Sequence, residues 1–184
     1  MEQNDSKNVF PLVSHTLKYQ GSILTVYQDL VELPNGNTAK WDVIDHKGAA
    51  AVIPVMSDGR ILMVRQYRHA IGRYTLEIPA GGRNSRDEKM EDAARRELEE
   101  ETGYCSDDME LLISIHTVAA YSNERINIYT ARNLRKGCQN LDDDEFIDVK
   151  PYSVEEISDM IFHQEIQDAK TISAVMSYRL KYGK

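Results

Sequence analysis

The sequence predicts a mixed α/β (α+β) sandwich with a mixed central sheet and an N-terminal antiparallel β-hairpin extension. Three observations support this fold class. Strand-like apolar runs fill most of the chain up to residue 82, a strong helix pattern covers 88–102, and more strand runs precede two closing helices. This order lacks the regular strand–helix alternation of a doubly wound sheet. A chain of 184 residues is long enough for one sizeable core.

The first elements form a hairpin followed by a buried strand. Residues 1–14 are predicted to be a frayed start. The segment 21–33 is rich in Ile, Leu, Val and Tyr and predicts a strand, and the Pro-Asn-Gly turn signal in 34–37 leads to a return strand at 38–45. The segment 48–55 is an unbroken apolar run, which is typical of a strand buried on both faces.

The rest of the chain continues this mixture. The dipeptide Asp58-Gly59 predicts a second tight turn, so that 61–68 pairs back on the preceding strand. Gly103 is a stop signal for the helix pattern before it. The remaining elements are a strand at 75–82, a helix at 88–102, strands at 111–121 and 126–134, a polar loop at 141–145 and helices at 154–166 and 168–181.

Composition narrows the class of protein. The net charge of −8 disfavours a partner with many phosphates, such as a nucleic acid, and an anionic membrane surface. The longest apolar stretch, 48–55, is too short to span a bilayer. The polar N-terminus lacks the apolar segment of a signal peptide, and two cysteines without metal-ligand spacing suggest a reducing compartment. We therefore expect a cytoplasmic protein with no nucleic-acid and no membrane partner.

The helix at 88–102 contains carboxylates where apolar residues are expected. At about 100° per residue, an apolar stripe centres on Met90 and includes Leu98. Glu97 and Glu101 fall within about 20° of Met90, and Glu100 lies at the edge of the stripe. Their spacing of three and four residues makes them neighbours on the helix surface. Three carboxylates are thus predicted on the packed side of the helix.

A positive charge must stabilise such a cluster, because burying unpaired carboxylates costs free energy and the carboxylates repel one another. Carboxylate oxygens are the ligands that Mg²⁺ and Mn²⁺ prefer, so the pattern indicates a metal site. The alternative is an ordinary solvated charge run, which the positions of Glu97 and Glu101 oppose. Arg96 is expected to orient these carboxylates through an ion pair. Gly81 and Gly82 permit a tight loop that can approach a metal or a phosphate closely.

Together these residues resemble the Nudix box, G-x5-E-x7-R-E-U-x-E-E-x-G-U, in which U is a bulky apolar residue. Its positions are filled by Gly82, Glu88, Arg96, Glu97, Leu98, Glu100, Glu101, Gly103 and Tyr104. The chain is thus similar to Nudix hydrolases, which cleave a nucleoside diphosphate linked to another moiety. The resemblance implies a Nudix-type α/β/α sandwich. The family's usual form opens the box at the first glycine of PAGG, which leaves open whether Gly81 or Gly82 supplies the metal-binding carbonyl.

The likeness extends over 20–180, which resembles the ADP-ribose pyrophosphatase branch of that family. The segments that carry it are 33–36, 48–55, 64–68, 77–82, 141–149 and 168–171. The branch implies two parts: N-terminal strands in 1–45 that serve as a dimerisation extension, and a hydrolase domain in 46–184. It therefore also implies a homodimer.

The same resemblance implies the catalytic machinery. Glu97, Glu100 and Glu101, with Gly81, would bind Mg²⁺, for which Mn²⁺ is a possible substitute. Glu145 in the acidic loop would act as the base or orient the attacking water, with Asp142, Asp143 and Asp144 as alternatives. The implied catalytic set is Glu145, Glu101, Glu100, Glu97, Arg96 and Glu88.

Five further residues are implied to bind substrate. Trp41 would stack on adenine across the dimer, or else serve as a core or interface residue. Arg65 and Arg68 would contact phosphates as charge-assisted donors. Glu77 is expected beside the pyrophosphate or these arginines, and Glu124 near the substrate or metal.

The resemblance implies cleavage of ADP-ribose, or a related nucleoside diphosphate sugar, to AMP and ribose 5-phosphate. One departure bears on the substrate: 118–120 reads Val-Ala-Ala, where this branch usually has Ser-Pro-Gly. Tyr121 follows, and a tyrosine near this position marks the dinucleoside-polyphosphate branch. Dinucleoside polyphosphates, GDP-sugars and oxidised nucleotides are thus alternative substrates. A non-catalytic nucleotide-sensing module is the alternative of a different class, which the complete set of box carboxylates disfavours.

Overall fold

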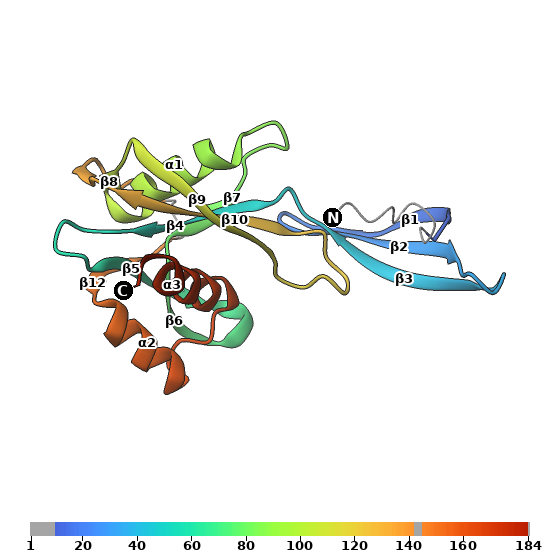
Figure 1. Ribbon diagram of the computed structural model, residues 1–184. Helices are drawn as coiled ribbons and strands as arrows, with labels where there is room; N and C mark the ends of the chain where they lie inside the picture. The colour runs from blue at the N-terminus through green and yellow to red at the C-terminus, as the bar shows by residue number, and fades with distance from the viewer. Residues whose placement is uncertain (1–9, 142–144, 184) are drawn as a thin grey trace. The chain divides into compact units, whose positions relative to one another are not determined.

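The computed structural model describes residues 10–141 and 145–183 (Figure 1). Internal contacts divide the chain into two compact units. The N-terminal unit contains the described residues up to His46 together with Val118–Glu124, and the main unit contains Lys47–Thr117 and the described residues from Arg125 onward. Each unit is described separately below.

The N-terminal unit is a three-stranded antiparallel sheet in the order β1-β2-β3. Its strands are β1 (Leu12–Gln20), β2 (Thr25–Glu32) and β3 (Thr38–Asp45). The β2–β3 hairpin confirms the predicted strands, and Gly36 in its turn adopts a left-handed backbone with φ 82°. The prediction that 1–14 is a frayed start is wrong from Leu12 onward. All of β1 is exposed and pairs through its backbone, so no burial pattern marks it in the sequence.

The main unit is built around a four-stranded mixed sheet in the order β7-β4-β10-β9. Its strands are β7 (Ala80–Gly82), β4 (Ala49–Pro54), β10 (Arg125–Arg132) and β9 (Asp108–His116). β4 and β10 run parallel, and the other pairs are antiparallel. The smaller sheets are β12 (Asp148–Tyr152) with β5 (Ile61–Arg68) and β6 (Arg73–Glu77), and β11 (Arg135–Lys136) with β8 (Tyr104–Cys105).

Helices cover both faces of the mixed sheet, which confirms the α/β/α sandwich. Figure 1 shows α1 (Met90–Thr102) on one side, and α2 (Val154–Phe162) and α3 (Ala169–Tyr182) on the other. Every residue of β4 is buried, as predicted. Ala50 and Val52 pack in the cluster that contains Leu98 of α1, whereas Ile53 packs in the cluster that contains Val175 of α3.

Several sequence-based predictions differ from the structure. The predicted pairing of 61–68 with the strand at 48–55 is wrong: β5 pairs with β6 and β12 in a different sheet from β4, and an isolated bridge joins Val55 to Ile61 beside the turn. The predicted strand at 75–82 forms two strands in different sheets, because the extended pairing is interrupted at Ile78-Pro79. The predicted strand at 111–121 starts earlier and ends at His116, and a turn at Val118–Tyr121 belongs to the N-terminal unit. The predicted helix at 154–166 ends at Phe162.

Capping explains where the helices begin and end. Ser153 and Glu156 form a capping box at the start of α2, and Asp168 caps α3 by accepting from the Thr171 backbone N–H. α1 ends at Gly103, whose left-handed backbone, with φ 70°, lets its N–H donate to Glu99 O. In the described part of the chain, no helix is long and apolar enough to cross a membrane.

Candidate active site

The buried face of α1 brings carboxylates to the mixed sheet. Glu97 is 8% exposed and Glu101 is 2% exposed, on the same side of the helix as buried Leu98. This confirms the helical-wheel prediction for both residues. Glu100 is half-buried, at the margin where the wheel predicts it. Two acidic side chains thus occupy core positions of the helix.

Arg96 holds this group of carboxylates together. Its Nη1 donates to Glu97 Oε1 at 2.6 Å and to Glu100 Oε2 at 2.9 Å. Its Nε donates to Glu88 Oε1 at 3.2 Å. Its Nη2 donates to the Gly82 carbonyl at 2.9 Å, which ties the helix to β7. One guanidinium therefore fixes three carboxylates, and the orienting ion pair predicted for Arg96 is present.

The two glycines of β7 have different surroundings. A Cβ added to Gly81 would lie 2.2 Å from the carboxylate carbon and Oε1 of Glu97, whereas one added to Gly82 would meet nothing within 4 Å. Gly81 is therefore the glycine that allows the loop to approach the carboxylate. The Gly82 carbonyl accepts from Arg96 instead. This arrangement favours Gly81 as the glycine of the site.

Burial perturbs both core carboxyl groups. Burial raises the pKa of Glu97 to about 7, with Arg96 opposing the shift. Burial and then the neighbouring Glu97 raise the pKa of Glu101 to about 8, although Glu101 Oε2 accepts from the Ala80 N–H at 3.0 Å. The charge of Glu145, in the loop of the predicted base, also contributes to raising both pKa values. Asp142, Asp143 and Asp144 lie outside the described residues.

The donor set suits a hard divalent cation. Burial raises the pKa of both carboxyl groups despite the nearby guanidinium of Arg96, so a cation that binds them directly would stabilise their ionised forms, and Mg²⁺ prefers carboxylate oxygens. Gly81 leaves room beside Glu97 that a Cβ would fill. Among the described residues, however, no three acidic, His or Cys side chains already converge as a metal site. Glu97 and Glu100 each use one carboxylate oxygen to accept from Arg96 Nη1 in this arrangement.

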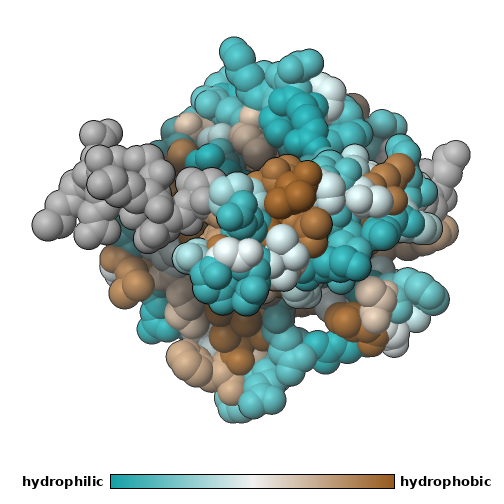
Figure 2. Space-filling model, turned by 90° about the vertical axis from the view of Figure 1, so that its right-hand side faces the viewer, coloured by the Kyte–Doolittle hydropathy of each residue, from teal (hydrophilic) through white to brown (hydrophobic). Residues whose placement is uncertain are grey.

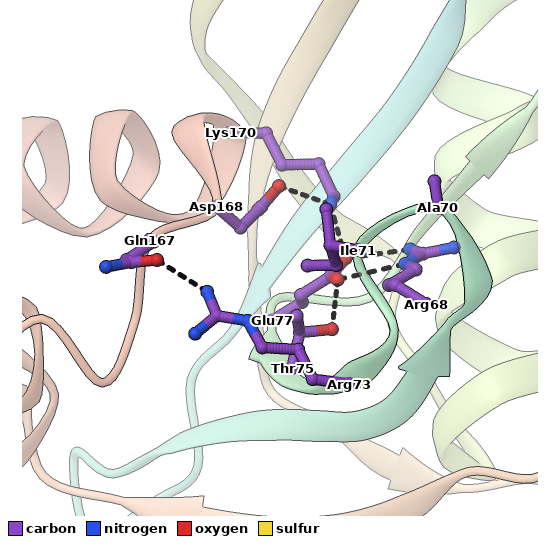
Figure 3. Close-up of a pocket in the computed structure, with 9 residues that line it drawn as sticks. All are labelled: Arg68, Ala70, Ile71, Arg73, Thr75, Glu77, Gln167, Asp168 and Lys170. Atoms are coloured by element: carbon purple, nitrogen blue, oxygen red, sulfur yellow. Dashed lines mark hydrogen bonds and ion pairs between the residues drawn. The ribbon is translucent and has the colours of Figure 1, made fainter.

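A second charged cluster surrounds Glu77 at the end of β6. Glu77 is 2% exposed, and Arg68 donates two hydrogen bonds to its carboxylate, from Nε at 2.9 Å and from Nη2 at 2.7 Å. Figure 3 shows Thr75 and Lys170 reaching the same carboxylate. These residues line a pocket of about 390 Å³ between the β5–β6 hairpin and the start of α3. Glu77 thus neighbours one of the predicted arginines, Arg68.

The other predicted substrate residues lie elsewhere. Arg65 stacks over the Tyr74 ring at 3.9 Å and lies 3.7 Å from Asp148, so it is not part of the Glu77 cluster. In the N-terminal unit, Trp41 is 44% exposed and lines a pocket with Tyr121. Trp41 is therefore not a core residue of this unit. Glu124 Oε1, also in that unit, lies 3.6 Å from His46 Nδ1.

Sequence reasoning assigned no role to Lys170, Asp168 or Thr75, although all three belong to the Glu77 cluster. The available signals were the resemblance of segment 168–171 to the family branch and a helix-capping Asp two residues before a Lys. These signals could not identify the partner, which lies 93 residues away in the chain.

The two glycines provide a matched test of the site. Gly81→Ala is expected to displace Glu97 and lower kcat/KM by about 10–100-fold, since small misplacements of reacting groups have effects of that size. Gly82→Ala is the control, because neither glycine has a left-handed backbone and only Gly81 faces the carboxylate. Initial rates of hydrolysis of ADP-ribose, the substrate that the resemblance implies, would measure both effects. Equal effects of the two substitutions would contradict the assignment of Gly81.

Comparison with known proteins adds a family and several relatives. The NUDIX domain family matches residues 45–175. A protein of Bacillus methanolicus named methanol dehydrogenase activator is 40% identical over 168 residues, which is 89% of each chain. An ADP-ribose pyrophosphatase of Bacillus subtilis is 35% identical over 165 residues, again 89% of each. A crystal structure of an ADP compounds hydrolase matches with a TM-score of 0.84 at 20% identity, covering 95% of this chain and 94% of that one.

Proposed function

Because the chain belongs to the Nudix domain family, we propose that it is a Mg²⁺-dependent hydrolase that cleaves the pyrophosphate of ADP-ribose, or of a related nucleoside diphosphate sugar, to AMP and ribose 5-phosphate. The observation that carries this proposal is the buried carboxylate pair Glu97 and Glu101, with Arg96 on one side and Gly81 on the other. The 35% identity to an ADP-ribose pyrophosphatase over 89% of the chain supports the substrate.

Glu97, Glu100, Glu101 and the Gly81 backbone would hold the metal in this proposal, with Mn²⁺ as a substitute for Mg²⁺. When bound, the ion supplies charge neutralisation of the pyrophosphate and activation of water. Hydrolysis needs positioned charges and no covalent nucleophile, so a site of carboxylates and arginines suffices.

Other side chains orient the carboxylates, accept the proton of the attacking water and bind a phosphate. Arg96 orients Glu97 and Glu100, and Glu88 in turn fixes Arg96 from the loop before α1. Glu145 takes the proton of the attacking water, supported by its electrostatic influence on both buried carboxylates. Arg68, which is partly exposed, binds a phosphate of the substrate with the guanidinium nitrogen that Glu77 leaves unused.

Relative specificity would test the substrate. We expect kcat/KM for ADP-ribose to exceed that for diadenosine tetraphosphate, GDP-mannose and 8-oxo-dGTP, each measured with Mg²⁺. In that case the Val-Ala-Ala sequence at 118–120 is a variation without effect on the substrate. A preference for diadenosine tetraphosphate would contradict ADP-ribose and implicate Tyr121. Binding of ADP-ribose without turnover of any compound would favour a nucleotide-sensing module.

A regulatory use of the same chemistry is the second candidate, favoured by the 40% identity to a methanol dehydrogenase activator. Here hydrolysis would serve to activate another enzyme. Wild-type protein and Glu101→Gln would be added to a methanol dehydrogenase. Activation by the wild type that is lost in the variant would support this candidate, and no activation by either would exclude it for that dehydrogenase.

Adenine stacking is proposed for Trp41. Trp41 is 44% exposed and lines a pocket with Tyr121, an arrangement that suits a flat base. Trp41→Ala is expected to raise KM for ADP-ribose about tenfold, as loss of one base–aromatic stack of about 1–3 kcal/mol would. Mg²⁺ affinity should stay unchanged, because the metal residues lie on other elements. An unchanged KM would remove the assignment.

Residues 1–45 are proposed to form a dimerisation extension of a cytoplasmic homodimer, with 46–184 as the hydrolase domain. Apolar residues reach the surface among polar ones (Figure 2), and several lie in the N-terminal unit. These are Phe10, Leu12, Val13, Leu17, Tyr19, Ile23, Leu24 and Trp41. Exposed apolar surface of this kind is typical of interfaces. Light scattering should give the mass of two chains, and a monomer would contradict the proposal.

The two free cysteines support the cytoplasmic location.

A further inference from the structure

The Glu77 cluster contains a buried carboxylate that is fully bonded. Oε1 accepts from Arg68 Nε at 2.9 Å and from Thr75 Oγ1 at 2.6 Å. Oε2 accepts from Arg68 Nη2 at 2.7 Å and from Lys170 Nζ. These donors come from three elements, β5, β6 and α3. Such bonding offsets the cost of burying a charge and holds every member in one arrangement.

Lys170 connects this carboxylate to the start of α3. Its Nζ also lies 3.0 Å from Asp168 Oδ1, and its side chain is only 12% exposed (Figure 3). Without the ammonium, the Glu77 and Asp168 carboxylates would face each other as like charges. A second contact fixes the same junction, since Thr171 Oγ1 accepts from the Ile78 N–H at 3.0 Å. The start of α3 is therefore joined both to Glu77, at the end of β6, and to Ile78, the residue after it.

Arg68 is the member of the cluster that reaches outward. Its side chain is 41% exposed, although Nε and Nη2 are both held by Glu77. The pKa of Arg68 is raised mainly by its hydrogen bonds to Glu77, and Glu101 adds to the shift. Arg68 is thus held by the buried Glu77 while part of its side chain stays exposed. A guanidinium held by two parallel bonds is fixed in plane and direction.

We propose that Lys170 is a positioning residue for hydrolysis: together with Asp168 it holds Glu77 in place, and Glu77 fixes the guanidinium of Arg68 for a phosphate of the substrate. The proposal rests on the proposed function for the role of Arg68. Lys170 itself does not touch the substrate in this account. Its effect on the reaction passes through Glu77 and Arg68.

A double-mutant cycle separates positioning from general stability. Lys170→Met keeps the length of the side chain and removes its charge, and we expect it to lower kcat/KM about 10–100-fold through misplacement of Arg68. Combined with Arg68→Ala, it should cause less than about a twofold further loss, because coupled residues are not additive. Lys170→Arg should recover much of the activity. Lys181→Met, at the exposed end of the same helix, is the matched control and should have no effect.

A second measurement needs no substrate. The Arg68 Nε–H signal can be followed by nitrogen-15 NMR and assigned by its loss in Arg68→Ala. We expect it to shift and broaden in Lys170→Met and to stay unchanged in Lys181→Met. If the wild type hydrolyses nothing, the proposed function fails, while this measurement still decides whether Lys170 positions Arg68.

Two results would overturn the inference. One is an Arg68 signal that is the same in Lys170→Met as in the wild type. The other is a loss of activity from Lys170→Met that is as large with Arg68→Ala as without it. Should Lys170→Met fail to fold, Thr75→Val removes another donor from the same carboxylate, and it is expected to give the same coupling and the same NMR change.

Discussion

Glu101→Gln is expected to lower kcat/KM for ADP-ribose about a thousandfold or more, the largest loss that we expect from a single substitution. Glutamine preserves the shape of the side chain and its acceptance of the Ala80 N–H, but it removes a buried negative charge that the metal requires. Loss of a single preorganised electrostatic contact costs about 10²–10³-fold, and a metal ligand contributes charge as well as position. Initial rates at saturating Mg²⁺ would measure the effect.

Glu91→Gln is the matched control. It makes the same chemical change on the same helix, at an exposed position where the carboxylate pairs with Arg95 four residues on. Such surface pairs contribute little, so activity should stay near the wild-type value. Equal activity of Glu101→Gln and the wild type would show that the buried carboxylate is not needed for hydrolysis.

The metal-free protein is expected to lose stability as the pH rises from about 4.5 to about 8. In the folded state the pKa of Glu97 is about 7 and that of Glu101 about 8, against an ordinary value of 4.5. In this range the folded state binds more protons than the unfolded state, so the free energy of unfolding falls with increasing pH. The contribution of the two protonated carboxyl groups to the free energy of unfolding is fully present below about pH 4.5 and is lost above about pH 8.

Thermal unfolding in a chelator, repeated across this pH range, would measure the effect. The double variant Glu97→Gln with Glu101→Gln should show a flatter profile than the wild type, and other titrating groups cancel in that comparison. Mg²⁺ should raise the melting temperature of the wild type at pH 8 but not that of the double variant, because binding to the folded state stabilises it. Parallel profiles of the two proteins would contradict the assigned pKa values.

Features encoded in a local pattern could be predicted from the sequence. The apolar run at 48–55 gave the buried strand β4, because a strand covered on both faces has no polar side. The helical period placed Glu97 and Glu101 on the packed face of α1, where the structure buries them. The charged neighbours of Arg96 lie within one helix and the loop before it, so sequence spacing sufficed to suggest its ion pairs.

Features that depend on distant partners could not be predicted in this way. β1 is exposed along its length, so no burial pattern marks it, and β12 is a five-residue strand at the edge of a sheet whose Pro151 argues against a strand in the sequence. The interruption at Ile78-Pro79 separates two strands, β6 and β7, that look like one strand in the sequence. Lys170 reaches Glu77 because the start of α3 meets the end of β6, and no local pattern contains that contact.

Product analysis of ADP-ribose by phosphorus NMR tests the central claim most directly. The purified protein would be incubated with ADP-ribose and Mg²⁺, with chelator in place of Mg²⁺ and the Glu101→Gln variant as controls. The account predicts the signals of AMP and ribose 5-phosphate with the wild type and Mg²⁺, and intact ADP-ribose in both controls. Intact ADP-ribose with the wild type and Mg²⁺, or the same products from Glu101→Gln at the same rate, would contradict it.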